Sequence, residues 1–270
     1  MHTSEYLVSN NKMTGEISPL ICKSKHLYAL DLSHNNLSGV LPQCLSNFSD
    51  SLSILALQNN KFHGSIPQTF MNGNNLKMIA LSNNQLQGRI PRSLVNCTHL
   101  EYLHLGNNQI SDIFPSWLGN LRELNVLIFK SNRLYGEIKE PEVKFEFPKL
   151  RVIDLSHNVF TGELPTKHFH TWNAMKVVNG SHLSYMHDEL QPTRPSVEVA
   201  SYDISYYTYS MTISNKGIEL NYGKISNMLT SIILSGNKFV GEIPASIGSL
   251  RGLNNLNLSH NNLQGHIPSS

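Results

Sequence analysis

The sequence has few charged residues and no cluster of charge. Only 15% of its 270 residues are Asp, Glu, Lys or Arg, and the formal net charge is +2. A surface that binds nucleic acid needs a basic patch, and no run of Lys and Arg provides one. We therefore expect no nucleic acid partner.

Segments that direct a chain to a membrane are also missing from the sequence. It has no stretch of 18 or more apolar residues, and its N-terminus lacks a basic segment followed by an apolar run. The sequence as given therefore predicts neither a signal peptide nor a membrane span.

Motifs for catalysis and metal binding are absent as well. We find no glycine-rich phosphate loop, no G-x-S-x-G element, no metal motif and no convergent pair of acids. The 13 histidines are scattered singly, and His34, His157 and His260 recur at one position of a repeat instead of converging. We expect no catalytic residues, no metal, no cofactor and no enzyme.

Cysteine is rare, with Cys22, Cys44 and Cys97 only, so at least one thiol is unpaired. This number neither requires nor excludes an oxidising compartment. Cys22 and Cys44 lie in adjacent repeats at nearly the same phase and are candidates for a disulfide if their offset is within reach. Cys97 occupies a position that suits a small buried residue.

What the sequence does contain is a repeat, L-x-L-x-x-N-x-L-x-G-x-I-P. Its glycine column is Gly15, Gly39, Gly64, Gly88, Asp112 (which replaces glycine), Gly136, Gly162, Gly241 and Gly265. Successive positions are 24 to 26 residues apart, except for the 79 residues between Gly162 and Gly241. Constant spacing predicts a solenoid, and the long interval predicts an insertion of about 55 residues in it.

Two other columns indicate how each repeat folds. The alternation Leu30-x-Leu32 has the period of a short strand with one buried face, so we expect stacked parallel strands. The asparagine column is Asn11, Asn35, Asn60, Asn84, Asn108, Asn132, Asn158, Asn237 and Asn261. Because a buried amide needs partners, we expect these side chains to bond backbone groups of neighbouring coils as a structural ladder.

The G-x-I-P element at this spacing resembles the plant-specific class of extracellular leucine-rich repeats. The resemblance implies a mostly β solenoid of the α/β type, with a right-handed superhelix, a concave parallel sheet and short helical or irregular turns on the convex face. We expect about seven repeats in residues 1–165, the first incomplete, a non-repeat island in residues 166–227, and two repeats in residues 228–270.

The island is rich in aromatic residues, including Trp172, Tyr202, Tyr206, Tyr207 and Tyr209. Alternation in residues 207–213 and 218–220 predicts two strands joined by a turn at residues 215–217, and residues 186–199 predict a loop. Two interpretations remain open. The hairpin packs onto the repeats, or its tyrosines bind a partner, since aromatic residues dominate binding hot spots.

The island motifs W-N-A-M-K (residues 172–176), Y-S-M-T (residues 209–212) and N-K-G (residues 215–217) resemble those of plant receptor-like proteins of the fungal-resistance and wilt-resistance type. So do the repeats that follow. The resemblance implies a kinase-free, single-pass protein on the extracellular face of the plasma membrane that senses microbial molecules or developmental peptides. In that family the island and the concave face contribute to perception of a peptide or protein ligand, and the repeats after the island engage a co-receptor kinase.

Members of that family also have a signal peptide, a cysteine-paired cap, an acidic spacer and a membrane helix. From their lack here we expect a fragment, a truncated product or an incomplete gene model. Two alternatives to a receptor remain open, namely a soluble inhibitor of a microbial cell-wall hydrolase and a truncated paralogue without function. Such inhibitors resemble an uninterrupted array of repeats, whereas the island interrupts the array in this chain.

Candidate ligand-binding residues follow from these expectations, although a solvated sheet face is an equally good interpretation of each one alone. They are Glu101, Tyr102, His104, Lys130, Arg151 and Asp154 on the sheet, and Trp172, Tyr202, Tyr206, Tyr207 and Tyr209 in the island. Candidate glycosylation sites are Asn47, Asn96, Asn179 and Asn257, while the sequon at Asn36 lies beside the ladder.

Overall fold

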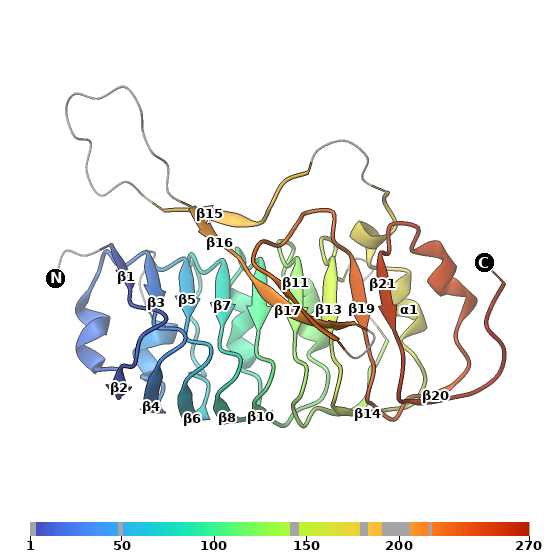
Figure 1. Cartoon of the computed structure of the whole chain (residues 1–270), viewed down its shortest axis with the longest axis horizontal. Coiled ribbons are helices and arrows are strands. Elements are labelled where there is room, and N and C mark those ends of the chain that lie inside the picture. The colour runs from blue at the N-terminus through green and yellow to red at the C-terminus, as the bar shows by residue number, and fades with distance from the viewer. Residues whose placement is uncertain are drawn as a thin grey trace.

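A computed structural model describes residues 4–47, 51–140, 146–178, 183–190, 206–215 and 218–269 of the chain. The chain winds into successive coils, one per repeat, with its N- and C-termini at opposite ends of the array (Figure 1). The sequence-based prediction of a leucine-rich-repeat solenoid is thereby confirmed.

Each coil contributes one strand to a parallel sheet, which we call the concave sheet, and we number the coils 1–9 by these strands. The strands are β1 (Glu5–Leu7), β3 (Ala29–Asp31), β5 (Ile54–Ala56), β7 (Met78–Ala80), β9 (Tyr102–His104), β11 (Val126–Ile128), β13 (Val152–Asp154), β19 (Ser231–Ile233) and β21 (Asn255–Asn257). Equivalent residues of successive coils pair, as in Leu30 with Leu55 and Leu55 with Ile79. The inward leucines of all coils therefore form one continuous core.

The conserved geometry of each coil depends on the turn that follows the strand. Asn35 donates from its side-chain nitrogen to the carbonyls of Val8 at 2.9 Å and Leu32 at 3.1 Å, and its oxygen accepts from the amide of Met13 at 3.0 Å. Eight of the ladder asparagines repeat this bridge to the preceding coil, and Asn11 makes only local bonds.

The residue before each ladder asparagine has a positive φ, between 52° and 65°. The nine residues are Asn10, His34, Asn59, Asn83, Asn107, Ser131, His157, Gly236 and His260. Glycine, asparagine and histidine adopt this left-handed conformation more readily than other residues. The recurring histidines therefore occupy a turn position at which the backbone is left-handed.

Short elements complete the coils. A second parallel sheet joins β2 (Thr14–Gly15), β4 (Asn36–Val40), β6 (Lys61–Ser65), β8 (Gln85–Gly88) and β10 (Gln109–Ile110), and further pairs are β12 (Tyr135–Glu137) with β14 (Val159–Thr161) and β20 (Val240–Gly241) with β22 (Asn262–Leu263). The helices are η1 (Pro19–Lys23), η2 (Gln43–Ser46), η3 (Arg92–Asn96), η4 (Ser116–Asn120), α1 (Thr166–Phe169), η5 (Asn173–Met175) and η6 (Ala245–Ser249).

The insertion interrupts the sequence but not the concave sheet, because β13 pairs directly with β19. The first ten residues of the island belong structurally to coil 7, since Phe169, Trp172 and Met175 are buried in the main core. The departure from the repeat fold therefore begins at Lys176, later than the expected boundary at Thr166.

The described residues in the rest of the island form two antiparallel strand pairs. These are β15 (His187–Glu189) with β16 (Tyr206–Thr208) and β17 (Met211–Asn215) with β18 (Ile218–Tyr222). The second pair confirms the predicted antiparallel strands at residues 211–213 and 218–220. The first predicted strand, residues 207–213, is wrong at its start, because Tyr207 and Thr208 belong to β16, and residues 216–217 of the predicted turn lie outside the described residues. The loop expected over residues 186–199 is wrong at β15, and residues 191–199 lie outside the described residues.

Candidate functional site

The island runs back over the concave sheet from coil 7 toward the N-terminal coils. In Figure 1, β15 and β16 lie above the strands of the early coils, and β17 crosses in front of the middle of the sheet. Its bonds reach Tyr28 and Asp31 in coil 2 and Lys130 in coil 6. The surface that an open solenoid would present to a ligand is thus largely occupied by the chain itself.

A second hydrophobic core lies between the island and the sheet. The sheet contributes Ala29, Ile54, Ala56, Met78, Ala80, Tyr102, Val126, Ile128, Val152 and Ile233, and the island side contributes Met186, Leu190, Tyr209, Met211, Ile213 and Ile225. All of them are buried. Removal of this apolar surface from water is the main force that holds the island down.

Tyr209 lies at the centre of this second core. Its side chain is fully buried, and its ring packs against that of Tyr102 with 5.7 Å between the ring centroids. The Tyr102 hydroxyl donates to the carbonyl of Ser210 at 2.9 Å. Burial raises the pKa of both phenols, so each remains neutral at physiological pH.

A buried carboxylate, Asp188 of β15, joins the island to three successive coils. It accepts hydrogen bonds from the Tyr28 hydroxyl at 2.6 Å, the Lys77 ammonium at 2.7 Å and the Ser53 hydroxyl. Burial alone would raise the pKa of Asp188, but the bonds from Lys77, Ser53 and Tyr28 outweigh it and lower the pKa below its usual value. Asp188 is therefore ionised and held by three side chains.

Two further polar contacts lie on either side of the second core. The Tyr207 hydroxyl donates to Asp31 at 2.8 Å, and the Lys130 ammonium donates to the carbonyl of Thr212 and to Glu219, both at 3.3 Å. The Lys130 side chain is nearly buried, while that of Glu219 is 62% exposed. Two charged side chains of the sheet, Asp31 and Lys130, thus make polar contacts with the island in addition to the apolar contacts of the second core.

These contacts change the interpretation of the candidate ligand residues on the sheet. Tyr102, His104, Lys130 and Asp154 are buried in this structure, and Glu101 is partly buried. The hairpin lies beside three of them, since Tyr102, His104 and Lys130 line a small polar groove together with island residues. Their contacts give them a structural role in docking or in their own strand, as when Asp154 accepts from the amide of Ser156.

The island candidates divide into three groups. Trp172 is 1% exposed in the main core, and Tyr207 and Tyr209 face the sheet, so these three are structural in this conformation. Tyr206 is 47% exposed and packs edge-on against His187 at 4.5 Å between centroids. Tyr202 lies outside the described residues.

The structure shows the hairpin packed onto the repeats, which was one of the two interpretations that the sequence left open. Sequence reasoning did not identify the surface that receives the island, although a signal for it exists. The outward positions of the central strands are apolar, including Ile54, Met78, Val126, Ile128 and Val152. Strands that are apolar on both faces are expected only where both faces are covered. Asp188 gave no such signal, because a single carboxylate in an irregular segment has no pattern.

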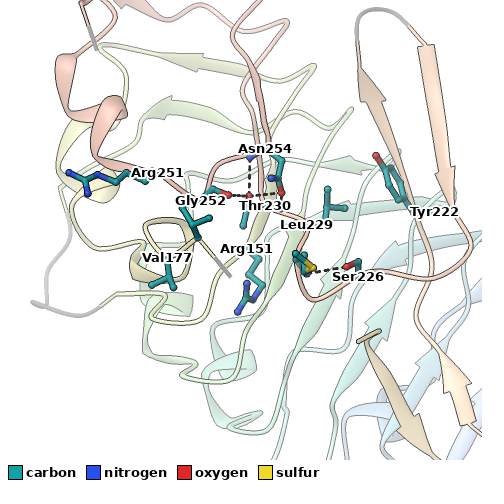
Figure 2. A pocket seen from close by; sticks show the side chains of 11 residues that line it. Arg151, Val177, Tyr222, Ser226, Leu229, Thr230, Arg251, Gly252 and Asn254 are labelled. Atoms are coloured by element: carbon teal, nitrogen blue, oxygen red, sulfur yellow. Dashed lines mark hydrogen bonds between the residues drawn. The ribbon is translucent and has the colours of Figure 1, made fainter. Parts of the chain in front are cut away.

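A pocket of about 340 Å³ lies where the island leaves and rejoins the repeats (Figure 2). It is lined mainly by apolar side chains, together with Arg151 just before β13 and with Thr230, Arg251, Gly252 and Asn254 of the coils after the island. In Figure 2 the Arg251 side chain extends away from the other labelled lining residues. Of the candidate residues on the sheet, Arg151 is the one that lines this open pocket. A smaller polar groove of about 200 Å³ lies between the hairpin and the turns of coils 2–6.

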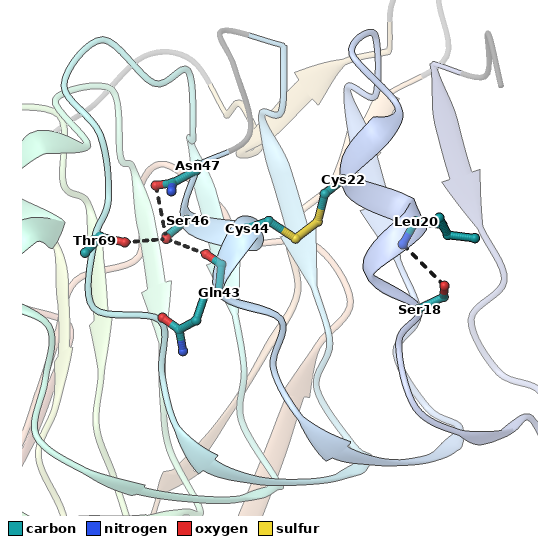
Figure 3. Close-up of a disulfide and its surroundings, with 8 residues drawn as sticks. All are labelled: Ser18, Leu20, Cys22, Gln43, Cys44, Ser46, Asn47 and Thr69. Atoms are coloured by element: carbon teal, nitrogen blue, oxygen red, sulfur yellow. Dashed lines mark hydrogen bonds between the residues drawn. A yellow bond between two sulfur atoms is a disulfide. The ribbon is translucent and has the colours of Figure 1, made fainter.

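The cysteines and sequons complete the candidate sites. Cys22 and Cys44 form a disulfide with Cα atoms 6.0 Å apart, between η1 and η2 of adjacent coils (Figure 3), and Cys97 is buried and free. Asn47 is exposed, whereas Asn96 donates to the carbonyl of Phe70 at 2.8 Å and Asn257 accepts from Ser259. Asn179 lies outside the described residues.

Neither a metal centre nor a membrane span is found in the part of the chain that the structure describes. Within it, no three His, Cys, Asp or Glu residues come together as ligands, and no helix has the length and apolarity that crossing a bilayer requires.

Family models for leucine-rich repeats match residues 26–48, 50–110, 98–160, 228–250 and 252–270. Among curated proteins of Arabidopsis thaliana, the chain is 41% identical to Receptor-like protein 54 over 246 residues and 49% identical to Receptor-like protein 6 over 247 residues. Each match covers 91% of this chain but only 30% and 23% of the relative. The chain thus spans less than a third of the length of the curated relatives it matches.

Solved ectodomains of plant receptors are similar in structure. The peptide hormone receptor RGFR1 in complex with RGF2 aligns with a TM-score of 0.73 at 29% identity over 98% of this chain and 33% of that chain. The Arabidopsis receptor kinase HAESA, solved with the peptide hormone IDA and the co-receptor SERK1, aligns with a TM-score of 0.73 at 26% identity over 99% of this chain and 35% of that chain.

Proposed function

Because this chain belongs to the leucine-rich-repeat family and is similar to plant receptor-like proteins, we propose that it is the ligand-recognition part of such a receptor. It acts outside the plasma membrane, in defence or development, by binding a peptide or protein and recruiting a co-receptor kinase. The observation that carries the proposal is the match over 91% of the chain, which takes in the repeats on both sides of the island.

The docked island suggests where a ligand would bind. Since most of the central outward side chains of the sheet are buried, recognition falls to the exposed part of the island and to the coils that it leaves open. Tyr206 and His187 form an exposed aromatic pair on the island. A large side chain with a polar tip, held by a neighbour, is typical of a binding hot spot.

The repeats after the island are the proposed contact for a co-receptor. Outward residues Asn255 and Asn257 of β21 are only partly buried, and the second core between the island and the sheet extends no further than Ile233 of coil 8. The HAESA structure supports the general mode of assembly, since it contains the receptor kinase together with the peptide hormone IDA and the co-receptor SERK1.

The chain offers a matched pair of tyrosines for a test. Tyr206 on the island is 47% exposed, and Tyr135 on β12 of the repeats is 45% exposed. We would secrete the tagged chain from plant cells and measure its association with the SERK1 ectodomain, with and without a peptide fraction of apoplastic fluid. We expect association only with the fraction, an at least fivefold loss in Tyr206→Ala, and wild-type association in Tyr135→Ala.

Other results would contradict the proposal. Equal association with the SERK1 ectodomain in the presence and absence of the peptide fraction would exclude ligand-dependent recruitment by this chain. Absence of association under both conditions would exclude it as well. Direct binding to a purified microbial cell-wall hydrolase without the co-receptor would instead support the inhibitor alternative.

A further inference from the structure

The pocket at the base of the island has an apolar lip that is exposed to solvent. Val177 is 56% exposed, Val178 is 71% exposed and Met228 is 38% exposed, and all three line the pocket. Val177 and Val178 lie where the chain leaves the repeats, and Met228 lies where it rejoins them. Exposed apolar side chains around a concavity mark a binding site more often than isolated ones do.

The far wall of this pocket is rigid. The Thr230 amide donates to the Asn254 side chain at 2.9 Å, the Thr230 hydroxyl donates to the carbonyl of Gly252, and the Gly252 amide donates to the carbonyl of Met175 at 2.9 Å. A Cβ added to Gly252 would collide with the carbonyl of Val177. This wall therefore packs directly against the backbone of Val177, and the pocket is formed without a ligand.

Arg151 supplies a charge that nothing in the described structure neutralises. Its guanidinium is partly buried and makes no hydrogen bond or ion pair with the described residues, and it lies among the other lining residues in Figure 2. Burial lowers the pKa of Arg151, and no acidic group counteracts that effect. A planar cation beside apolar side chains fits a carboxylate that is attached to an apolar group.

We infer that this pocket binds one or two residues of a peptide, with a carboxylate on Arg151 and an apolar side chain against Val177, Val178 and Met228. The inference rests on the proposed function and names the chemistry of its ligand. The volume of about 340 Å³ is at the small end of the range for ligand pockets, about 300–1,000 Å³, which suits the end or one turn of a peptide rather than a whole chain.

Three small probes separate the possible sources of the carboxylate. They are acetyl-Leu-Phe with a free C-terminal carboxylate, acetyl-Leu-Phe-amide, and acetyl-Leu-Phe-Asp-amide with the carboxylate in a side chain. Binding to the whole chain would be followed by the methyl NMR signals of Val177, Val178 and Met228. We expect saturable shifts. The affinity for at least one carboxylate probe should be about tenfold above that for the amide, because a hydrogen bond to a charged group contributes enough binding free energy for a tenfold change in affinity.

Arg151→Gln should remove the preference for a carboxylate, and Arg133→Gln, an exposed arginine of coil 6, should keep it. Because the Arg151 side chain makes no hydrogen bond with the described residues, and its backbone bonds to Asn125 and Ser231 do not depend on the side chain, Arg151→Gln should melt at the wild-type temperature. Preference for the free C-terminus identifies a peptide end, and preference for the aspartate probe identifies an acidic residue.

Equal affinity of all three probes, absence of shifts at millimolar concentration, or an unchanged preference in Arg151→Gln would each overturn the inference. None of these results depends on Tyr206 or on the co-receptor. Failure of the pocket can therefore be distinguished from failure of the proposed receptor function.

Discussion

Replacement of Asp188 by alanine should release the island while leaving the repeats folded. The variant removes the acceptor for Tyr28, Ser53 and Lys77. Loss of one partner from a buried charged pair costs about 3–5 kcal/mol. We take the lower value, about 3 kcal/mol, because the Lys77 side chain is 38% exposed and can turn toward water.

A loss of about 3 kcal/mol raises the population of the undocked island about a hundredfold, since each 1.4 kcal/mol is a factor of ten. Amide hydrogen exchange measures this population directly. The informative amides are those of Tyr209 and Ile225, which donate to the carbonyls of Met186 and Tyr209 respectively. Their exchange should be about a hundredfold faster in Asp188→Ala, with amides of the concave sheet unchanged.

Glu123→Ala provides the control, because it removes an exposed ion pair with Lys149 that should contribute less than about 1 kcal/mol. Island amides that exchange less than fivefold faster in Asp188→Ala would refute the argument. Equal acceleration in the concave sheet would also refute it, since the island would then not open as a separate unit.

The same carboxylate makes docking sensitive to strong acid. Its pKa is lowered in the folded state, so its contribution is complete above the unfolded pKa of about 4 and is lost as the pH falls through the folded pKa. In hydrogen exchange, the island amides should therefore lose protection at pH values below about 4.

Three other outcomes follow from the structure. Burial, together with the nearby charge of Lys130, lowers the pKa of His104 to about 3. The folded protein should therefore lose up to about 1.4 kcal/mol per pH unit as the pH falls from about 6.5 to about 3, and His104→Gln should flatten this part of the urea-denaturation profile. Asn108→Ala should lower the free energy of unfolding by about 1–3 kcal/mol, because it leaves backbone groups of two coils unpaired; an unchanged urea midpoint would contradict the ladder. Cys97 is buried, which raises the pKa of its thiol to about 12, so iodoacetamide should label it only after unfolding, as mass spectrometry would detect.

The sequence predicted the repeats well because each coil is specified locally. Every column has one physical task, as with the amide of Asn35 that bridges two backbones or the left-handed residue His34 before it. The hairpin was also predictable, since the alternation of Met211 and Ile213 with polar residues is a short-range signal.

Docking of the island was not predictable in the same way, because its contacts join residues far apart in the chain. Asp188 and Tyr28 are separated by 160 positions, and no repeat column links them. The candidate residues Tyr102 and Lys130 were expected to face a ligand, and the structure places the island on them instead. The apolar outward residues of the sheet, such as Ile128, indicated that this face of the sheet is covered.

One consequence of the direct pairing of β13 with β19 is mechanical. The island leaves the array without interrupting the concave sheet. It then contacts the inner face of the sheet from coil 2, where Tyr207 binds Asp31, to coil 8, where Ile233 joins the second core. A long spring of coils bends easily, because each coil contacts only its neighbours. Because the docked island contacts several successive coils, it should limit bending between them. We therefore expect the coils that the island contacts to move as one rigid body, and bending of the solenoid to occur mainly in the coils that it does not contact.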